Sequence, residues 1–546
     1  MKSLRLIGIA TVLLRYRLDE LVDATHLYRP LKWVRALLPA ARGDLAALPR
    51  GERLRLALTE LGPIFVKFGQ ILSTRRDVLP ADIADALAQL QDQVAPFPGA
   101  VARRQIERAL GAPVTQLYAE FDERPLASAS IAQVHAARLH DGRAVVVKVL
   151  RPDIHARVER DIATLSALAT LAERWHPNAD KIRPLDIAEE TAKTLRHELD
   201  LQREAANASL LKRNYPDGRD LYVPEVHWPL TAERVLTMER IHGVRSDDVA
   251  ALDRLGIDRQ RLAEKGVRLF YEQVFRDNFF HADAHPGNIW VDPTRIDEPR
   301  FIALDFGIMG SLPDADQYWL AENFIALFER DYRRIATLHL AAGWIPPTVR
   351  LDELEAAVRT VCEPYFTRPL AEISLAEVAV KLFQTGRRFE LTIQPQLILL
   401  QKTLLNIDGL GRQLDPRIDI WAVAHPVLKR IMRERYSPRR ALKTVRARLP
   451  QWLHAAPEMP DLLHAWLRHA VDGKQRMEVS SSELAALRAQ QAHSQRSLAA
   501  GLLGATLALA AVLLWTLAPE RGPWPPLLAA GGAVLAFGLA WPWRRR

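Results

Sequence analysis

Two carboxylates and one amide stand at spacings that suit chemistry on nucleotide phosphates. Asp283 lies in the segment HADAHPGN at 281–288, and Asn288 follows it by five residues. Asp305 begins an Asp-Phe-Gly triplet 17 residues after Asn288, directly after the apolar run 301–304. In such an arrangement the first aspartate orients or deprotonates an attacking hydroxyl, while the amide oxygen and the second aspartate hold a metal ion on the phosphates. We therefore predict Asp283 as the catalytic residue, with Asn288 and Asp305 as ligands of Mg²⁺ bound with ATP or ADP.

A transition-metal site is the main competing interpretation of the same segment. His281, Asp283 and His285 have side chains of the right type for such a site. No further cluster of His and Asp follows at the spacing of a metal-dependent hydrolase, so this interpretation is less favoured. A polar turn with a purely structural role is less favoured still.

Lys148 stands inside a β-branched run, AVVVKVL at 144–150. A lysine in such a strand is costly to bury without an anionic partner. It is either an edge-strand lysine that faces water or a phosphate-binding lysine held by a glutamate on a following helix. Glu204 is well placed for that second role, and Glu190 and Glu198 are competitors.

A loop of small residues precedes this lysine, where a glycine-rich phosphate loop would lie. Small side chains let the backbone approach phosphate oxygens, but alanine is stiffer than glycine, and a plain tight turn is the competing interpretation. The predicted ATP-binding residues of this loop are Leu126, Ala127, Ser128, Ala129, Ser130, Ile131, Ala132, Gln133 and Val134. The loop, the lysine, the glutamate, the Asp/Asn pair and Asp-Phe-Gly follow one another, over about 180 residues, in the order of a protein-kinase-like fold.

A second motif lies upstream of the loop, in a predicted helix. Lys67 and Gln70 are three residues apart in KFGQ and therefore share a helix face. Glu198 and Asp200 offer an acidic pair that could meet them. The competing interpretation is an ordinary solvated helix face.

The element pattern predicts an α+β, two-lobe, protein-kinase-like fold with a helical N-terminal extension and a C-terminal transmembrane helical hairpin. Asp141-Gly142, between two β-branched runs, predicts a hairpin turn in the small lobe. The predicted parts, in chain order, are the extension 1–115, the N-lobe 116–242, the helical C-lobe 243–470, a linker 471–497, and transmembrane helices 498–518 and 523–543.

The two C-terminal runs carry no charge, and each is long enough to cross a bilayer. Basic residues flank the pair on both outer sides, which predicts that both ends face the cytoplasm. The competing interpretation is a buried hairpin of a soluble core. The apolar run 4–14 contains Arg5 and lacks a cleavage site, so an amphipathic helix fits it better than a signal peptide. The predicted location is a membrane, with the kinase-like part in the cytoplasm.

Composition sets wider limits. The 546 residues have a net charge of +9, which is too diffuse for a nucleic-acid partner and fits membrane lipids or anionic ligands. Cys362 is the single cysteine, so neither an intrachain disulfide nor an all-cysteine metal site can form.

Taken together, these motifs resemble the UbiB family of atypical protein-kinase-like proteins. The resemblance runs from about residue 50 to 430 and extends to the C-terminal apolar pair. Its carriers are KFGQ at 67–70, PLASASIAQVH at 125–135, VKV at 147–149, ELD at 198–200, HADAHPGN at 281–288 and LDFG at 304–307.

The resemblance implies a membrane-associated, ATP-dependent role in aerobic ubiquinone biosynthesis, in support of the ring-modifying monooxygenases. It implies that Lys67 and Gln70 face the nucleotide site and approach Glu198 and Asp200. It also implies that Lys148 binds the α/β-phosphates, with Glu204 as its partner. The family's alanine-rich loop goes with altered nucleotide preference and poor protein-kinase activity, so an ATPase or regulatory kinase is expected.

Two other functions stay open. HADAHPGN also resembles the loop of aminoglycoside and choline kinases, which suggests a small-molecule or lipid phosphotransferase. A non-catalytic scaffold that binds isoprenoid quinone precursors and ubiquinone-biosynthesis enzymes is the third hypothesis.

Overall fold

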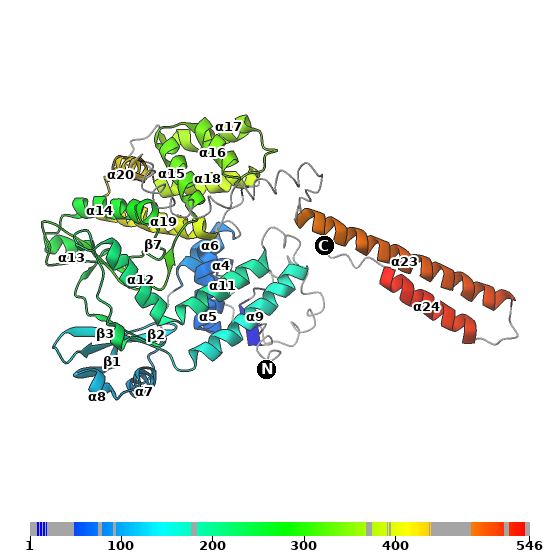
Figure 1. The fold of residues 1–546 in the computed structure, drawn as a ribbon, viewed down its shortest axis with the longest axis horizontal. Coiled ribbons are helices and arrows are strands. Elements are labelled where there is room, and N and C mark those ends of the chain that lie inside the picture. The colour runs from blue at the N-terminus through cyan, green and yellow to red at the C-terminus, as the bar shows by residue number, and fades with distance from the viewer. Residues whose placement is uncertain are drawn as a thin grey trace, which may run out of the picture. The chain divides into compact units, whose positions relative to one another are not determined.

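The computed structural model describes residues 8–9, 11–13, 15–16, 18, 48–74, 79–90, 94–175, 183–366, 374–389, 391, 395–435, 437, 482–517 and 524–540. The chain divides into two compact units, 1–440 and 441–546, and each is considered by itself. The first unit contains the helical extension, a small lobe built on an antiparallel sheet, and a larger, mostly helical lobe (Figure 1).

The sheet of the small lobe has four strands in the order β1-β2-β3-β5, all antiparallel. Their bounds are Glu120–Ser128, Ala132–Arg138, Ala144–Leu150 and Val235–Glu239. The predicted Asp-Gly hairpin is confirmed, because β2 pairs with β3 and Gly142 has φ +89°. One face of the sheet packs on helix α7 (Gly99–Leu110) and the short helix α8 (Val114–Leu117) around buried valines of β3.

In the extension, the helices α4 (Arg50–Leu61), α5 (Pro63–Thr74) and α6 (Ala81–Ala88) pack on one another. Gly62 ends α4 at φ +109° and Pro63 opens α5, so the chain reverses without a long loop. Gly69 lies so close to the ends of two leucines that a Cβ there would come within 2.4 Å of the nearer one. The glycine of the KFGQ motif is thus explained by close helix packing.

Three helices link the extension and the two lobes: α9 (Ile154–Trp175), α11 (Pro184–Glu198) and α12 (Leu201–Asn214). Helices α9 and α11 pack together, and Leu165 of α9 also joins the core of the extension. Helix α12 packs against β5 and carries its buried residues at helical spacing, which include Glu204. The helices thereby place charged side chains between the extension and the sheet.

The larger lobe contains two small sheets, with strand orders β4-β9-β8-β6 and β10-β7. The strands are β4 (Leu221–Tyr222), β6 (Val244–Arg245), β7 (Phe280–His281), β8 (Ile289–Val291), β9 (Phe301–Ala303) and β10 (Met309–Gly310). The helices are α13 (Val249–Arg254), α14 (Arg259–Tyr271), α15 (Asp314–Phe328), α16 (Tyr332–Ala341), α17 (Leu351–Phe366), α18 (Leu375–Gly386), α19 (Pro395–Leu414) and α20 (Ile420–Arg435). Shorter turns of this lobe are the 3-10 helix η6 (Arg387–Phe389) and the π-helical turn η4 (Glu272–Arg276), while the 3-10 helix η3 (Trp228–Leu230) packs on β5 of the small lobe.

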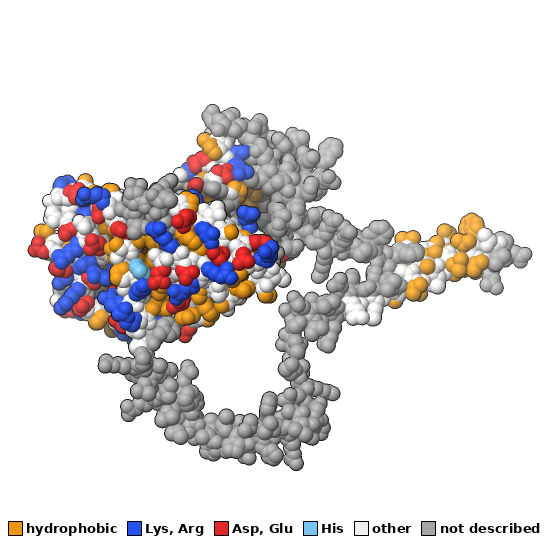
Figure 2. All heavy atoms as spheres, turned by 90° about the horizontal axis from the view of Figure 1, so that it is seen from above, with side chains coloured by type: hydrophobic (Ala, Val, Ile, Leu, Met, Phe, Trp, Pro, Cys, Tyr) orange, Lys and Arg blue, Asp and Glu red, His pale blue; other side chains and the backbone are white. Residues whose placement is uncertain are grey.

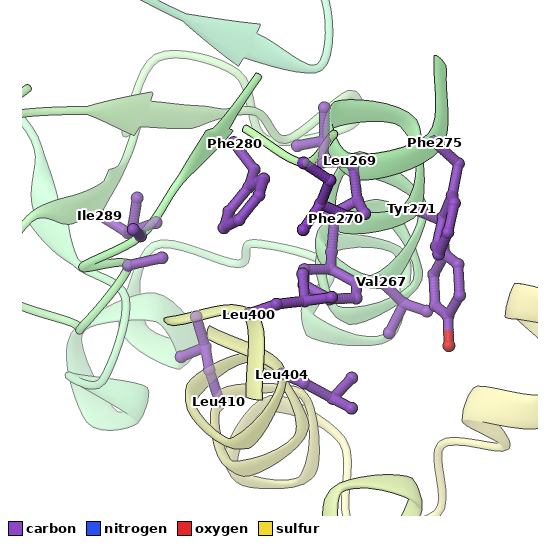
Figure 3. Close-up of a cluster of buried hydrophobic side chains, with 14 of the residues drawn as sticks. Val267, Leu269, Phe270, Tyr271, Phe275, Phe280, Ile289, Leu400, Leu404 and Leu410 are labelled. Atoms are coloured by element: carbon purple, nitrogen blue, oxygen red, sulfur yellow. The ribbon is translucent and has the colours of Figure 1, made fainter. Parts of the chain in front are cut away.

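Helices α14 and α19 form the centre of this lobe. Figure 3 shows leucines of α19 near aromatic side chains of α14 and Phe280 of β7. Phe270, Phe280, Leu400 and Leu404 are each at most 5% exposed. At roughly 1.5–3 kcal/mol for each fully buried side chain, this contact fixes α19 beneath the loop that carries Asp283.

The second unit contains two helices that pack side by side, α23 (Ser482–Leu517) and α24 (Trp524–Ala540). Their exposed side chains are largely apolar, as the orange spheres of Figure 2 show. Within the described helices, one stretch is long and apolar enough to cross a membrane by length and composition: Ala499–Thr516, with mean hydropathy 1.9. Helix α23 starts inside the predicted linker 471–497, and the second predicted span, 523–543, stays a prediction.

Candidate functional site

Lys148 and Glu204 form a buried ion pair at the boundary between the sheet and α12. The Lys148 Nζ atom donates to both carboxylate oxygens of Glu204, at 2.8 and 2.9 Å. The exposed fractions of the two side chains are 16% and 5%. Burial alone would lower the pKa of Lys148, but the carboxylates of Asp305 and Glu204 raise it above the ordinary value. Glu204, rather than Glu190 or Glu198, is therefore the contact of this lysine, which stays charged.

Helix α12 also holds the Asp-Phe-Gly segment. Asn207, one turn after Glu204, donates its amide hydrogen to the Phe306 carbonyl oxygen at 2.9 Å. The Phe306 backbone also favours the ionised carboxylate of Glu204, whose pKa burial raises. Asp305 has φ +54°, a left-handed conformation that non-glycine residues rarely adopt. That turn leaves the Asp305 side chain half exposed, with Oδ1 at 3.6 Å from Lys148 Nζ.

His281 ties the loop of Asp283 to the segment before Asp305. Its Nε2 atom donates to the Leu304 carbonyl oxygen at 3.2 Å, and its Nδ1 atom accepts from the Asp283 backbone N–H at 3.2 Å. Burial lowers the pKa of His281, which favours the neutral ring that these two bonds require. Because both ring nitrogens are used, His281 is not available as the metal ligand that the competing interpretation needs.

The backbone of Asn288 adds a second tie between the same segments, since its carbonyl oxygen accepts from the Leu304 N–H at 2.8 Å. The Asn288 side-chain nitrogen donates to the Asp283 carbonyl oxygen at 3.2 Å. This bond uses the amide nitrogen and not the oxygen Oδ1. The structure thus brings Asp283, Asn288 and Asp305 together at adjoining loop ends.

Asp283 meets a lysine that the sequence analysis did not single out. Lys402 of α19 donates to Asp283 Oδ1 at 2.7 Å, and His285 Nε2 lies 3.7 Å from Oδ2. Burial alone would raise the pKa of Asp283, but the Lys402 ammonium, followed by His285 and Lys67, brings it well below its usual range. The aspartate is therefore ionised at neutral pH.

The extension reaches the site through Lys67 of α5. Its Nζ atom lies 3.2 Å from Glu198 Oε1, and the two side chains are 14% and 6% exposed. The charge of Lys67 also lowers the pKa of both Asp283 and Asp305. For Asp305, burial opposes this shift and the Lys148 ammonium contributes more than Lys67 does.

Gln70 and Asp200, the other two residues of the expected contact between KFGQ and the acidic pair, have other partners. Gln70 donates to the Leu90 carbonyl oxygen at 2.9 Å, inside the extension. Asp200 instead caps α12, with its side chain accepting from the Gln202 N–H at 3.0 Å. An aspartate directly before a helix satisfies backbone N–H groups that have no partner within the helix, which explains this outcome.

The predicted nucleotide loop spans the end of β1, a three-residue tip and the start of β2. Leu126, Ala127 and Ala129 are exposed, Ser130 and Ala132 are buried, and Ser128, Ile131 and Val134 are intermediate. Gln133 is fully buried, and its amide exchanges two hydrogen bonds with the Phe97 backbone, at 3.0 and 3.1 Å. Its side chain therefore holds the segment before α7 against β2, and its role as an ATP-binding residue stays a prediction.

Arg151 clamps the tip of this loop. Its guanidinium donates to the carbonyl oxygens of Ala129 and Ala95, each at 3.0 Å, and to Ser128 Oγ at 2.8 Å. The guanidinium also lies 5.6 Å from the centre of the Phe97 ring. The loop is thus attached to the segment that connects the extension to the sheet.

The donor set suits Mg²⁺ bound together with a nucleotide. Mg²⁺ prefers oxygen ligands and is commonly held by one or two protein groups plus substrate phosphates. Asp305 and Asn288 supply a carboxylate and an amide oxygen at adjoining loops, and Asp305 is half exposed toward solvent. Within the described ranges, no group of three or more His, Cys, Asp or Glu forms a self-sufficient metal site.

Lys402 and Arg151 are the site residues that sequence reasoning missed. Lys402 is a lysine in the otherwise mostly apolar helical segment 396–405, and Arg151 directly follows β3. Neither belongs to a recognisable motif, and their partners are 119 and at least 22 residues away. A charged residue inside an apolar helical run was the available signal for Lys402.

Two family models match this chain. Residues 89–339 match the ABC1 atypical kinase-like domain, and residues 358–419 match the UbiB helical domain. A protein of Xanthomonas campestris pv. campestris (strain B100) named probable protein kinase UbiB is 59% identical over 553 residues, which cover 100% of this chain and 99% of that protein. A protein of the same name from Xylella fastidiosa (strain 9a5c) is 58% identical over 551 residues and 100% of both chains.

Among solved structures, the Rv3197–erythromycin complex from Mycobacterium tuberculosis matches with 24% identity and a TM-score of 0.47. The match covers 68% of this chain and 93% of that one.

Proposed function

Because the chain belongs to the UbiB family of kinase-like proteins, we propose that it is a membrane-anchored, ATP-dependent factor of aerobic ubiquinone biosynthesis. In this proposal it binds ATP or ADP with Mg²⁺ and acts as an ATPase or a regulatory kinase. It assists the ring-modifying monooxygenases at the bacterial inner membrane.

The observation that carries the proposal is the meeting of four segments at one place. Lys148 and Glu204 form their ion pair beside Asp305. His281 connects the segment before Asp305 to the loop of Asp283. Such a set suits phosphate binding by the lysine, metal binding by Asp305, and orientation of an attacking oxygen by Asp283. Mg²⁺, when bound, would neutralise charge on the phosphates.

The position of Lys67 supports an ATPase more than a protein kinase. Helix α5 of the extension brings this ammonium close enough to influence both Asp283 and Asp305. It is held there by a nearly buried pair with Glu198. A protein substrate would have to reach the same aspartates, whereas a water molecule needs far less room.

Membrane anchoring rests on α23. Its stretch Ala499–Thr516 has the length and hydropathy of a span, and Leu502, Leu509 and Trp515 in it are 63–68% exposed. Exposed apolar side chains on this scale are costly in water and favourable in lipid. Membrane lipids, ubiquinone-biosynthesis enzymes and isoprenoid quinone precursors are the proposed partners.

The first test measures nucleotide binding and phosphate release by the purified full-length protein in detergent. Asp305→Asn should weaken Mg²⁺-dependent nucleotide binding by about tenfold or more, while Asp283→Asn should keep binding and lose hydrolysis by about 100-fold. Asp141→Asn, at an exposed turn of the sheet, is the matched control and should resemble the wild type. A wild-type protein without Mg²⁺-dependent nucleotide binding would refute the proposal.

The second test asks what the chemistry serves. In a strain that lacks the protein, Asp283→Asn should fail to restore ubiquinone and should leave an early prenylated phenol. Restoration by this variant would instead favour a non-catalytic scaffold. Labelled phosphate on a phenolic or isoprenoid intermediate, rather than as free phosphate, would favour a small-molecule or lipid phosphotransferase.

A further inference from the structure

An ammonium group from outside the ABC1-matched segment reaches the loop of Asp283. Lys402 lies in α19, within residues 358–419 that match the UbiB helical domain. Its Nζ atom donates to Asp283 Oδ1 at 2.7 Å, although 119 residues separate the two in sequence. The contact joins the helical region to the proposed active site.

The backbone around Lys402 is held firmly against this loop. Leu400 and Leu404 are 5% and 4% exposed and pack in the core with α14 (Figure 3). The hydroxyl of the next residue, Thr403, is buried; it donates to the Leu399 carbonyl oxygen at 3.0 Å within α19 and lies 3.4 Å from the His281 carbonyl oxygen. Lys402 is therefore positioned by packing, and its approach to Asp283 is not the chance contact of a long surface side chain.

Lys402 is more open to solvent than the two other lysines of the site. Its side chain is 34% exposed, against 16% for Lys148 and 14% for Lys67. An ammonium carries three donors, and the bond to Asp283 uses one of them. The remaining donors of Lys402 can therefore take an anionic partner without breaking that bond.

The place of this cation relative to a nucleotide follows from the roles of its neighbours. If Lys148 holds the inner phosphates and Asp283 orients the attacking oxygen, the terminal phosphate must lie on the side of Asp283. The segment HADAHPGN contains no Lys or Arg, so a lysine or arginine at that end must come from another part of the chain. Lys402 is in hydrogen-bond contact with Asp283 and meets this requirement.

We propose that Lys402 positions the terminal phosphate of ATP against Asp283, so that the helical region contributes a residue to the active site. The inference rests on the proposed function, because it requires that the site binds ATP. It adds a specific prediction: the helical region recognises the phosphate that distinguishes ATP from ADP.

The test compares the affinities of a non-hydrolysable ATP analogue and ADP, each with Mg²⁺, by titration calorimetry on the full-length protein. Lys402→Ala should weaken binding of the analogue by about tenfold, as expected for one charge-assisted hydrogen bond, and change ADP binding by less than about twofold. Lys402→Arg should recover part of the loss. Lys429→Ala removes a lysine of the neighbouring α20 that pairs with Glu329 at 2.7 Å, and should match the wild type for both nucleotides.

The outcomes separate this proposal from the proposed function. If the wild type binds neither nucleotide, both fall together. If the wild type binds both and Lys402→Ala behaves like Lys429→Ala, or weakens the two nucleotides equally, only the role of Lys402 is refuted. Faster hydrolysis by Lys402→Ala would also refute it, since the lysine would then restrain Asp283. Thermal unfolding checks that each variant folds, and Lys402→Gln, which keeps most of the side-chain volume, replaces the alanine variant if that one does not.

Discussion

Replacement of Arg151 by methionine should release the predicted nucleotide loop while leaving the sheet intact. The guanidinium bonds to Ala129 and Ser128 on the loop and to Ala95 on the segment before α7. Methionine keeps an unbranched apolar chain of similar length but has no hydrogen to donate. The change therefore removes the clamp without opening a large cavity.

The size of the effect follows from the hydrogen bonds and the ring contact that the substitution removes. Three hydrogen bonds at about 1 kcal/mol each, together with about 0.5 kcal/mol for the contact with the Phe97 ring, give roughly 3.5 kcal/mol. Water replaces part of this stabilisation when the loop opens, so we expect a net decrease of about 2.5–3 kcal/mol in the free energy of loop opening. This corresponds to about a 100-fold increase in the population of the open loop.

Hydrogen exchange followed by mass spectrometry measures this population directly. Peptides that cover 94–98 and 126–134 should exchange about 100-fold faster in Arg151→Met, while peptides from α14 should not change. Arg143→Met is the matched control, because Arg143 lies at the exposed end of the same sheet and pairs with Asp141. Unchanged exchange in 126–134, or equal acceleration in the control, would show that Arg151 does not restrain the loop.

Three further variants test the packing and charges around the site, each by urea unfolding of the full-length protein in detergent. Gly310→Ala should destabilise the folded protein by about 1–3 kcal/mol, because a Cβ there would come within 2.4 Å of a phenyl ring. Its control, Gly409→Ala, adds a methyl group in open space on α19 and should be neutral or stabilising. Equal effects of the two substitutions would contradict the packing argument. Lys67→Ala should lower the unfolding free energy by about 3 kcal/mol, because it removes the ammonium beside a nearly buried carboxylate. Adding Glu198→Gln should recover part of this loss, and no recovery would argue against the ion pair. Because burial lowers the pKa of His281, the folded state resists its protonation, so this residue should lower the unfolding free energy by up to about 1 kcal/mol as pH drops from 6.5 to 5.5. His281→Gln should lack this part of the decline, and a pH profile identical to that of the wild type would refute it.

The parts of the site that could be predicted are those encoded by contiguous segments. HADAHPGN and LDFG each combine a functional side chain with the turn that presents it, so their chemistry can be inferred without knowledge of packing. The Asp-Gly turn likewise fixes the pairing of β2 with β3 over a few residues, and this pairing sets the position of Lys148 in the sheet. Local rules were sufficient in these places because few distant residues compete for the same groups.

Side-chain contacts could not be predicted where a polar side chain had a nearer or better-buried partner. Asp200 stands directly before α12, so capping of the helix outweighs a contact with the extension. Gln133 alternates into the buried face of β2, where its amide pairs with the Phe97 backbone. The contact of Lys402 with Asp283 depends on how α19 packs beneath the loop, which no local pattern records.

The three lysines of the site come from three separate parts of the chain, and this separation has a consequence for nucleotide binding. Lys67 belongs to the extension, Lys148 to the sheet and Lys402 to the helical region, and each already has a carboxylate within 3.2 Å. An incoming polyphosphate must share these cations with their acidic partners, so binding requires adjustment of contacts that also hold the parts together. Salt screens the ion pairs, which lowers the energy needed to adjust them. Salt also weakens the attraction between the lysines and the phosphates. Because the pairs of Lys67 and Lys148 are largely shielded from solvent and an approaching nucleotide is not, salt should lower the association rate strongly and change the dissociation rate little. Equal salt dependence of the two rates would mean that the lysines meet the phosphates as exposed charges, and that the ion pairs of the structure do not persist in solution.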